Sequence, residues 1–295
     1  MPRFIQAKSI LNKKKQRDPW FLDDYTINPY SGCSFNCLYC YIRGSKYGSN
    51  MTRSLTIKEN AVELLDKELG KRASKGEHGF IVLASATDPY LQLEKEIGIT
   101  RKLLEVILKH RFPVHVITKS DLVQRDFDLL QRIDETAILP EDLAGKLDHG
   151  VILTFSFSAV SDEVAAIFEP GATPPSLRLK TLKASSGNGF KTGVSMMPLL
   201  PFISDTADHL KLMMKSFNEA GAHYVMPATL TLFGSGPSDS KVLTLRAISR
   251  HYPELLPRYQ RYFEHNHGLP DYYQKAFKKK MREMLLTHGL TDRIV

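Results

Sequence analysis

The sequence has 295 residues, of which 42% are hydrophobic and 24% are charged, a composition typical of a globular chain that can bury a large core. The first residues lack the apolar run of a signal peptide, and no stretch approaches the roughly 20 apolar residues that span a membrane. We therefore expect a cytoplasmic protein without a membrane segment. The net charge of +8 lies partly in basic runs at 13–17 and 275–282, which are either solvated faces or contacts to phosphates.

Short β-type runs alternate with helical patterns along the chain. Apolar and β-branched residues predict buried strands at 25–30, 79–84, 114–118, 151–155, 192–196 and 223–226. Apolar residues at helical spacing predict helices that include 61–69 and 210–217. For the second helix, Ser204 or Asp205 is the expected N-cap and Gly221 the expected end.

Six strand–helix units indicate a parallel α/β fold. Six units are too few for a closed barrel of eight strands. The expected fold is therefore a partial (β/α)6 TIM-like barrel of parallel strands with a mainly helical C-terminal extension. We expect a basic N-terminal arm at 1–24, the barrel at 25–237 and the extension at 238–295, with a loop insertion at 135–149.

The three cysteines of the chain lie together as Cys33, Cys37 and Cys40, with the spacing C-x3-C-x2-C and with Tyr39 before the last one. An odd, clustered set argues against a disulfide framework and suits a reducing compartment. Thiolates bind zinc or iron–sulfur clusters, and inert thiols are a third interpretation. A structural zinc site needs a fourth ligand, for which only a distant histidine such as His265 or His267 is available.

An iron–sulfur cluster with an open iron is the interpretation that we favour for this loop. A [4Fe–4S] cluster usually has four cysteine ligands, so three cysteines leave one iron without a protein ligand. That iron can chelate the amino and carboxylate groups of S-adenosylmethionine. An electron from the cluster then breaks a carbon–sulfur bond and releases a 5′-deoxyadenosyl radical, so the cofactors carry the difficult chemistry.

The cysteine motif resembles the signature of the radical S-adenosylmethionine (SAM) superfamily. More narrowly, the chain is similar to the spore photoproduct lyase-related branch, often described as DNA repair photolyase-like. The motifs that carry this resemblance are the cysteine loop, Thr87-Asp88-Pro89-Tyr90, Ile117-Thr118-Lys119-Ser120, Phe155-Ser156-Phe157-Ser158, and Phe168-Glu169-Pro170-Gly171 followed by Arg178. The similar region extends from about Asn28 to Ala228.

The resemblance implies roles for individual residues at the carboxyl ends of the strands, where α/β barrels carry their active sites. It implies cofactor binding by Tyr39, Ser85, Thr87, Asp88, Lys119, Ser156, Ser158, Glu169 and Arg178, and radical transfer by Tyr41. Structural alternatives exist for all of them, namely turn caps, surface charges, polar strand ends, a braced loop and aromatic packing.

The chain departs from the related lyases at one position. Those enzymes donate a hydrogen atom from a fourth cysteine, and Ser85 stands there in this sequence. A serine O–H bond is much stronger than a cysteine S–H bond, so we do not expect thymine-dimer lyase activity. The expected function is a radical SAM enzyme that acts on nucleic acid with a flavodoxin- or ferredoxin-like electron donor. The alternatives are a protein or small-molecule substrate and, more remotely, a non-enzymatic metal-binding protein.

Overall fold

The computed structural model describes residues 2–46, 48, 55–83 and 86–295. Its main sheet has seven strands in the order β10-β9-β8-β7-β6-β3-β2. These strands are β2 (Leu11–Lys13), β3 (Tyr25–Ile27), β6 (Ile81–Leu83), β7 (Val114–Thr118), β8 (Val151–Ser156), β9 (Lys191–Leu199) and β10 (Tyr224–Thr229). All neighbours in this sheet pair in parallel except β2, which is antiparallel to β3.

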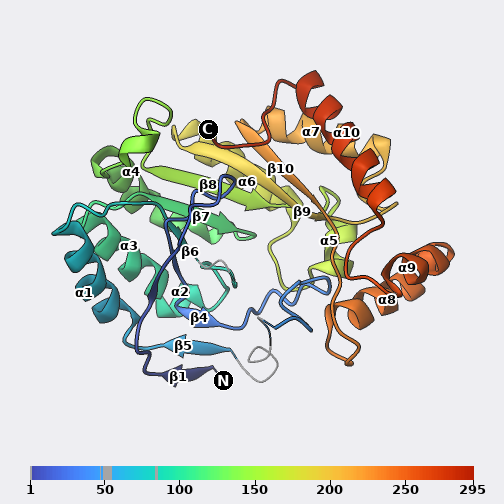
Figure 1. The fold of residues 1–295 in the computed structure, drawn as a ribbon, viewed down its shortest axis with the longest axis horizontal. Helices are drawn as coiled ribbons and strands as arrows, with labels where there is room; N and C mark the ends of the chain where they lie inside the picture. The colour runs from blue at the N-terminus through green and yellow to red at the C-terminus, as the bar shows by residue number, and fades with distance from the viewer. Residues whose placement is uncertain (1, 47, 49–54, 84–85) are drawn as a thin grey trace.

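The six parallel strands form the expected partial barrel, and the sheet curves around an interior that the helices cover from outside (Figure 1). Every residue of β8 is buried, as expected for a strand covered on both faces. The prediction of a partial parallel barrel is confirmed. The strand β2 comes from the N-terminal segment and extends the sheet at its edge.

A second sheet of three strands lies below the barrel in the order β1-β5-β4. Its strands are β1 (Arg3–Ile5), β4 (Tyr30–Ser31) and β5 (Thr56–Lys58). The single strand predicted at 25–30 is therefore wrong in extent, because β3 ends at Ile27 and Tyr30 pairs with Ile57 of the small sheet. Pro29 lies between the two strands and has no N–H to donate, which explains the break.

Helices follow the strands along the chain. The barrel helices are α1 (Ala61–Ala73), α2 (Glu94–Ile97), α3 (Ile99–Lys109), α4 (Phe127–Thr136), α5 (Asp162–Phe168), α6 (Pro175–Gly187) and α7 (Ala207–Glu219), with 3-10 turns η1 (Leu122–Asp126) and η2 (Glu141–Leu143). The C-terminal segment adds α8 (Ser240–His251), η3 (Pro253–Leu255), α9 (Leu256–Phe263) and α10 (Asp271–Thr287). These last helices gather on one side of the barrel, where α10 lies along α7 (Figure 1). No helix in the described ranges is long and apolar enough to cross a membrane.

The N-cap of α7 differs from the prediction. Thr206 caps the helix by accepting a hydrogen bond from the His209 N–H, whereas Ser204 and Asp205 are already engaged in the preceding turn. The Ser204 hydroxyl accepts from the Leu200 N–H at 2.8 Å, and the Asp205 carboxylate accepts from the backbone of that turn. The helix ends at Glu219, and Gly221 has φ +81°, so the predicted end of the helix is confirmed.

Candidate active site

The cysteine loop follows β4 and reaches the carboxyl ends of the parallel strands. Cys33, Cys37 and Cys40 are all partly buried and are free thiols. Main-chain hydrogen bonds join this loop to residues 168–171, with the Leu38 N–H donating to the Phe168 carbonyl and the Gly171 N–H to the Phe35 carbonyl, both at 2.9 Å. A Cβ atom on Gly171 would lie 2.4 Å from the Ser34 carbonyl oxygen, so only glycine allows this approach. The two loops therefore fold as one unit.

Burial makes the Cys33 and Cys37 thiols costly to ionise without a bound cation. Burial raises the pKa of the Cys33 thiol to about 12 and also raises the pKa of Cys37, so a bound cation must compensate for ionising them. Within the described ranges, no three His, Cys, Asp or Glu side chains gather closely enough to hold one metal ion. Thiolates bind zinc or the irons of a cluster, and a donor set of three cysteines suits an iron–sulfur cluster in which each thiolate binds a different iron.

Glu169 is the centre of the polar contacts around the cysteine loop. Its Oε1 accepts hydrogen bonds from the Tyr39 hydroxyl and, at 2.8 Å, from the Ser158 hydroxyl. Its Oε2 binds the Arg178 guanidinium. Lys119 Nζ lies 4.0 Å from Oε1. Two distant parts of the sequence, at Tyr39 and Lys119, therefore meet the segment from Ser158 to Arg178 at one buried carboxylate.

Arg178 is fully buried and stabilises both Glu169 and the strand end beside it. Its Nη1 donates to the Ser156 carbonyl at 2.5 Å, and its Nε donates to the Thr173 carbonyl at 2.6 Å. Burial alone would raise the pKa of the Glu169 carboxyl, but the charges of Arg178 and Lys119 and the hydrogen bonds it accepts hold that pKa below its usual value. Glu169 therefore stays ionised beside the thiols.

Asp88 holds the neighbouring strand ends together. Its carboxylate accepts hydrogen bonds from the Thr118 hydroxyl at 2.7 Å, from the Lys119 N–H at 2.8 Å and from the Tyr90 N–H at 2.9 Å. Burial raises the pKa of Asp88 above its usual value. Thr87 contacts the cysteine loop directly, because its hydroxyl donates to the Gly32 carbonyl at 2.8 Å.

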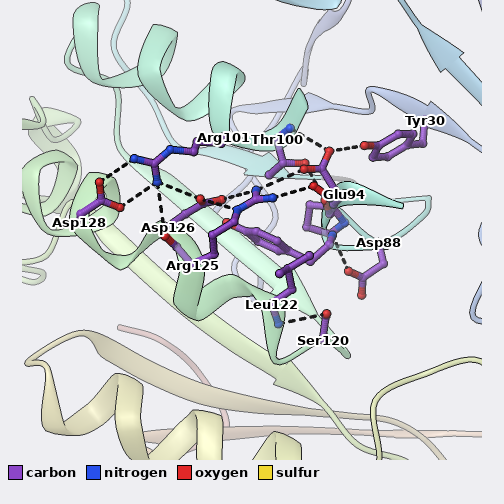
Figure 2. A network of polar contacts seen from close by, with 12 residues as sticks. Tyr30, Asp88, Glu94, Thr100, Arg101, Ser120, Leu122, Arg125, Asp126 and Asp128 are labelled. Atoms are coloured by element: carbon purple, nitrogen blue, oxygen red, sulfur yellow. Dashed lines mark hydrogen bonds and ion pairs between the residues drawn. The ribbon is translucent and has the colours of Figure 1, made fainter. Parts of the chain in front are cut away.

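A second buried carboxylate, Glu94, supports the start of the cysteine loop (Figure 2). It accepts a hydrogen bond from the Tyr30 hydroxyl and, at 3.0 Å, from the Thr100 N–H. The Arg125 guanidinium lies 3.3 Å from Oε2 of Glu94 and also binds Asp126 with two bonds of 2.8 Å. The chain of charges continues through Arg101, which contacts Asp126 and Asp128 and so reaches the surface (Figure 2).

The structure brings most of the predicted site residues into this region. Those with described contacts here are Cys33, Cys37, Cys40, Tyr39, Thr87, Asp88, Lys119, Ser156, Ser158, Glu169 and Arg178. Ser156 takes part through its carbonyl oxygen, and its side chain is buried. Tyr41 is 47% exposed, and Ser85 lies outside the described residues. The functional roles of all these residues, the cysteines included, stay predictions.

The sequence analysis did not predict the residues that support the site through hydrogen bonds, namely Thr118, Glu94 and Tyr30. Thr118 lies inside a motif that was singled out, yet its bond to Asp88 depends on a neighbouring strand. Glu94 and Tyr30 are separated by 64 residues, and the only signal for the pair is that each belongs to a segment next to a site motif. The usable signal in the sequence is an acidic residue, Glu94, shortly after the Thr87-Asp88-Pro89-Tyr90 motif.

Comparisons with known proteins agree with this geometry. The chain is 26% identical over 273 residues to an uncharacterized protein of Mycobacterium tuberculosis, covering 90% of this chain and 75% of the relative. It is 30% identical over 210 residues to an uncharacterized protein of Methanocaldococcus jannaschii, covering 68% of each. Its fold is similar, with a TM-score of 0.63 and 16% identity, to a spore photoproduct lyase variant with bound AdoMet and dinucleoside spore photoproduct, covering 97% of this chain and 78% of that one. The sequence profile described as the Radical SAM superfamily matches residues 27–213, and the chain therefore belongs to the radical SAM superfamily.

Proposed function

We propose that this enzyme cleaves S-adenosylmethionine reductively at a [4Fe–4S] cluster held by Cys33, Cys37 and Cys40, and that the resulting radical acts on a nucleic acid. The family implies S-adenosylmethionine and an iron–sulfur cluster, and its members generally need an electron donor. The observation that carries the proposal is the single region in which the three thiols lie beside Lys119 and Glu169. We infer a flavodoxin- or ferredoxin-like donor in a reducing cytoplasm.

The residues of the chain supply binding and orientation. When bound, the cluster would supply the electron that breaks a carbon–sulfur bond of S-adenosylmethionine and so splits the cofactor into methionine and a 5′-deoxyadenosyl radical. Lys119 offers a positive charge for the carboxylate of the cofactor; its side chain is only 13% exposed, and its ammonium group lies 4.0 Å from Glu169. Asp88 offers a negative charge for the amino group. Three hydrogen bonds already occupy its oxygens, out of about four lone-pair sites that a carboxylate presents.

Nucleic acid is the substrate class that the charge of the chain and its relatives support best. The net charge of +8 favours a polyanionic partner. The solved structure of similar fold contains a dinucleoside photoproduct. The reaction itself should differ from lyase chemistry that needs a thiol donor, because all three cysteines of this chain are committed as ligands.

A protein or small-molecule substrate is the second candidate, and the cysteine count favours it. With three ligand cysteines and Ser85 at the donor position, no thiol is available to quench a thymine radical. A substrate-dependent rise in 5′-deoxyadenosine across a panel of oligonucleotides, peptides and metabolites separates the two candidates.

Anaerobic reconstitution tests the cofactor chemistry directly. We expect about four irons and four sulfides per chain, an electron paramagnetic resonance (EPR) signal after dithionite reduction that changes when S-adenosylmethionine is added, and formation of 5′-deoxyadenosine with methionine. Cys37→Ala should lose the signal and the products. Ser34→Ala is the matched control, because Ser34 lies in the same loop and is exposed. A wild-type enzyme with an intact cluster and no cleavage of S-adenosylmethionine contradicts the proposal.

A further inference from the structure

Four aromatic rings meet where the end of β9 approaches α9 and the start of α10. Phe202 follows β9, Tyr262 lies on α9, and Tyr272 and Tyr273 open α10. Ring centroids are 6.0 Å apart for Phe202 and Tyr262, 5.7 Å for Tyr262 and Tyr273, and 6.5 Å for Tyr262 and Tyr272. We call these four residues the aromatic corner. Tyr272 is 62% exposed, whereas Tyr262 is buried and Phe202 and Tyr273 are partly buried, so the corner presents one open ring to solvent, backed by the others.

Two arginines of α9 lie over rings of the aromatic corner. The Arg258 guanidinium is 5.0 Å from the Phe202 ring centroid, and the Arg261 guanidinium is 5.7 Å from the Tyr262 centroid. Both arginines are exposed residues. A planar cation held over an aromatic face has a second face free for another flat group. The corner therefore combines stacking surfaces with positive charge.

A row of basic side chains continues from the corner along α10. Lys275, Lys279 and Arg282 follow Tyr272 at helical spacing and are exposed, whereas the opposite face of α10 is buried through Phe277 and other apolar residues. We call these three residues the basic stripe. In the described part of the chain, none of them forms an ion pair. Residues 256–287 contain seven Lys or Arg against three Asp or Glu, which is half of the net charge of +8.

One apolar cluster joins the aromatic corner to the cysteine loop. The Tyr259 hydroxyl donates to the Pro201 carbonyl at 2.8 Å, and the Tyr273 hydroxyl donates to Asp205, so α9 and α10 are fixed to the segment after β9. The apolar cluster beneath the corner includes both Tyr262 and Tyr39, the residue before the last cysteine. These helices lie together on one side of the barrel (Figure 1).

We propose that the aromatic corner and the basic stripe bind a single-stranded nucleic acid and direct it toward the cysteine loop. This inference rests on the proposed function and names the surface through which the substrate is held. The exposed Tyr272 ring and the planar guanidinium groups of α9 can stack on unpaired bases, and the row of lysine and arginine side chains can follow the phosphates. A duplex hides its base faces, and an acidic peptide satisfies the charges but leaves the rings without partners. The combination therefore favours a single strand.

Binding measurements on the reconstituted full-length enzyme test the surface. Fluorescence anisotropy would follow a labelled single-stranded 20-mer, the duplex of the same sequence and a labelled poly-glutamate peptide. The triple variant Lys275→Gln, Lys279→Gln, Arg282→Gln should weaken binding of the single strand about tenfold or more near 0.1 M salt. It should also reduce the slope of log K against log salt by about 2, since each phosphate contact contributes roughly 0.7.

The matched control removes the same charge from the other side of the barrel. Lys67→Gln, Lys71→Gln, Lys75→Gln changes three exposed lysines on and just after α1, and it should alter affinity less than about twofold. Tyr272→Ala should weaken binding about tenfold, whereas Tyr272→Phe keeps the ring and should bind like the wild type. Thermal unfolding of each variant shows whether it is folded.

The outcomes distinguish this surface from the cofactor chemistry. Equal losses in the α10 and α1 triple variants, tighter binding of the duplex, or equally tight binding of poly-glutamate would each overturn the inference. Cleavage of S-adenosylmethionine without substrate should be unchanged in all these variants. If the wild type binds the single strand but does not cleave the cofactor, the proposed function fails while the binding surface stands.

Discussion

Each end of the cysteine loop is fixed by a tyrosine that donates a hydrogen bond to a buried glutamate, but the two glutamates have different surroundings. At the start, the Tyr30 hydroxyl donates to Glu94, and before the last cysteine, the Tyr39 hydroxyl donates to Glu169. Both glutamates are almost completely buried, and each binds one arginine. A tyrosine, a glutamate and an arginine thus form one triad at each end of the loop, and the two triads fix its position together.

The triads differ in what lies beyond the arginine. Arg178 is fully buried, and its partner Glu169 faces Lys119 and the thiols. The Arg125 side chain is 26% exposed and passes its contacts to Asp126 and, through Arg101, to the surface. The Tyr39 triad is therefore closed to solvent and faces the cofactor region. The Tyr30 triad is connected to solvent through Arg101 and Asp128.

Replacing the arginine of each triad should give the largest difference in unfolding free energy between the two triads. Arg178→Met leaves Glu169 buried without its charge partner and should lower the free energy of unfolding by about 3–5 kcal/mol. Arg125→Met should cost less, about 1–3 kcal/mol, because the Arg125 side chain is 26% exposed whereas Arg178 is fully buried. Denaturant unfolding of the protein without cofactors measures both. Equal losses in the two variants would show that the surroundings of the triads do not matter.

His115 is a buried titratable side chain outside the two triads. His115 Nδ1 lies 2.8 Å from the Phe21 carbonyl oxygen and Nε2 lies 2.6 Å from the Thr154 hydroxyl, and burial lowers the pKa of His115 to about 4. The unfolded chain takes up this proton near pH 6.5, so stability should fall by up to about 3 kcal/mol as the pH drops from about 6.5 to 4. Glu169, with its lowered pKa, should cost stability only at lower pH.

The control for this pH dependence is His115→Gln, which keeps hydrogen-bonding groups and cannot titrate. Unfolding free energies of the two proteins between pH 4 and 7 should converge at the acidic end. Burial also lowers the pKa of His209 and His223, so a smaller slope should remain in the variant. Identical slopes in both proteins would remove His115 from this explanation.

The tyrosines should separate stability from cofactor binding. Tyr30→Phe and Tyr39→Phe each remove one hydrogen bond to a buried carboxylate, so each should cost about 1.5–3 kcal/mol of unfolding free energy. Only Tyr39→Phe should raise the KM for S-adenosylmethionine, because Glu169 lies beside Lys119 whereas Glu94 does not. Steady-state formation of 5′-deoxyadenosine measures this, and a raised KM in both variants would make the triads equivalent.

The surface end of the Tyr30 triad should give the smallest effect. The Asp128 side chain is 59% exposed and meets the Arg101 guanidinium. Asp128→Asn should therefore lower stability by less than about 1 kcal/mol, and 1 M salt should erase the difference. Asp126→Asn, at a fully buried position in the same chain of charges, should cost more and respond less to salt.

The fold was largely predictable because the strands carry strong local signals. The strand at Val114–Thr118 matches its predicted range, and β8 extends the predicted range by one residue. These segments are apolar and buried on both faces, so their pattern is independent of their neighbours. The N-terminal strand β2 has no such signal, because its residues are partly or fully exposed and only pairing with β3 makes it a strand.

The site was predictable in its members and less so in its contacts. The cysteines, Glu169 and Arg178 lie together as the motifs indicate. The hydroxyl and carboxylate groups of Thr87 and Asp88, however, bind the chain itself, and two of those partners, Gly32 and Thr118, lie 30 or more residues away. Such contacts depend on which strands are neighbours, which local spacing does not encode.

The pairing of the cysteine loop with residues 168–171 has a consequence for how the protein is made. The backbone partners of Phe35 and Leu38 are synthesised more than 100 residues after the cysteines. The chain must therefore be synthesised beyond Gly171 before the cysteine loop can form its native backbone hydrogen bonds. Until then the cysteine loop lacks the backbone partners that fix its shape.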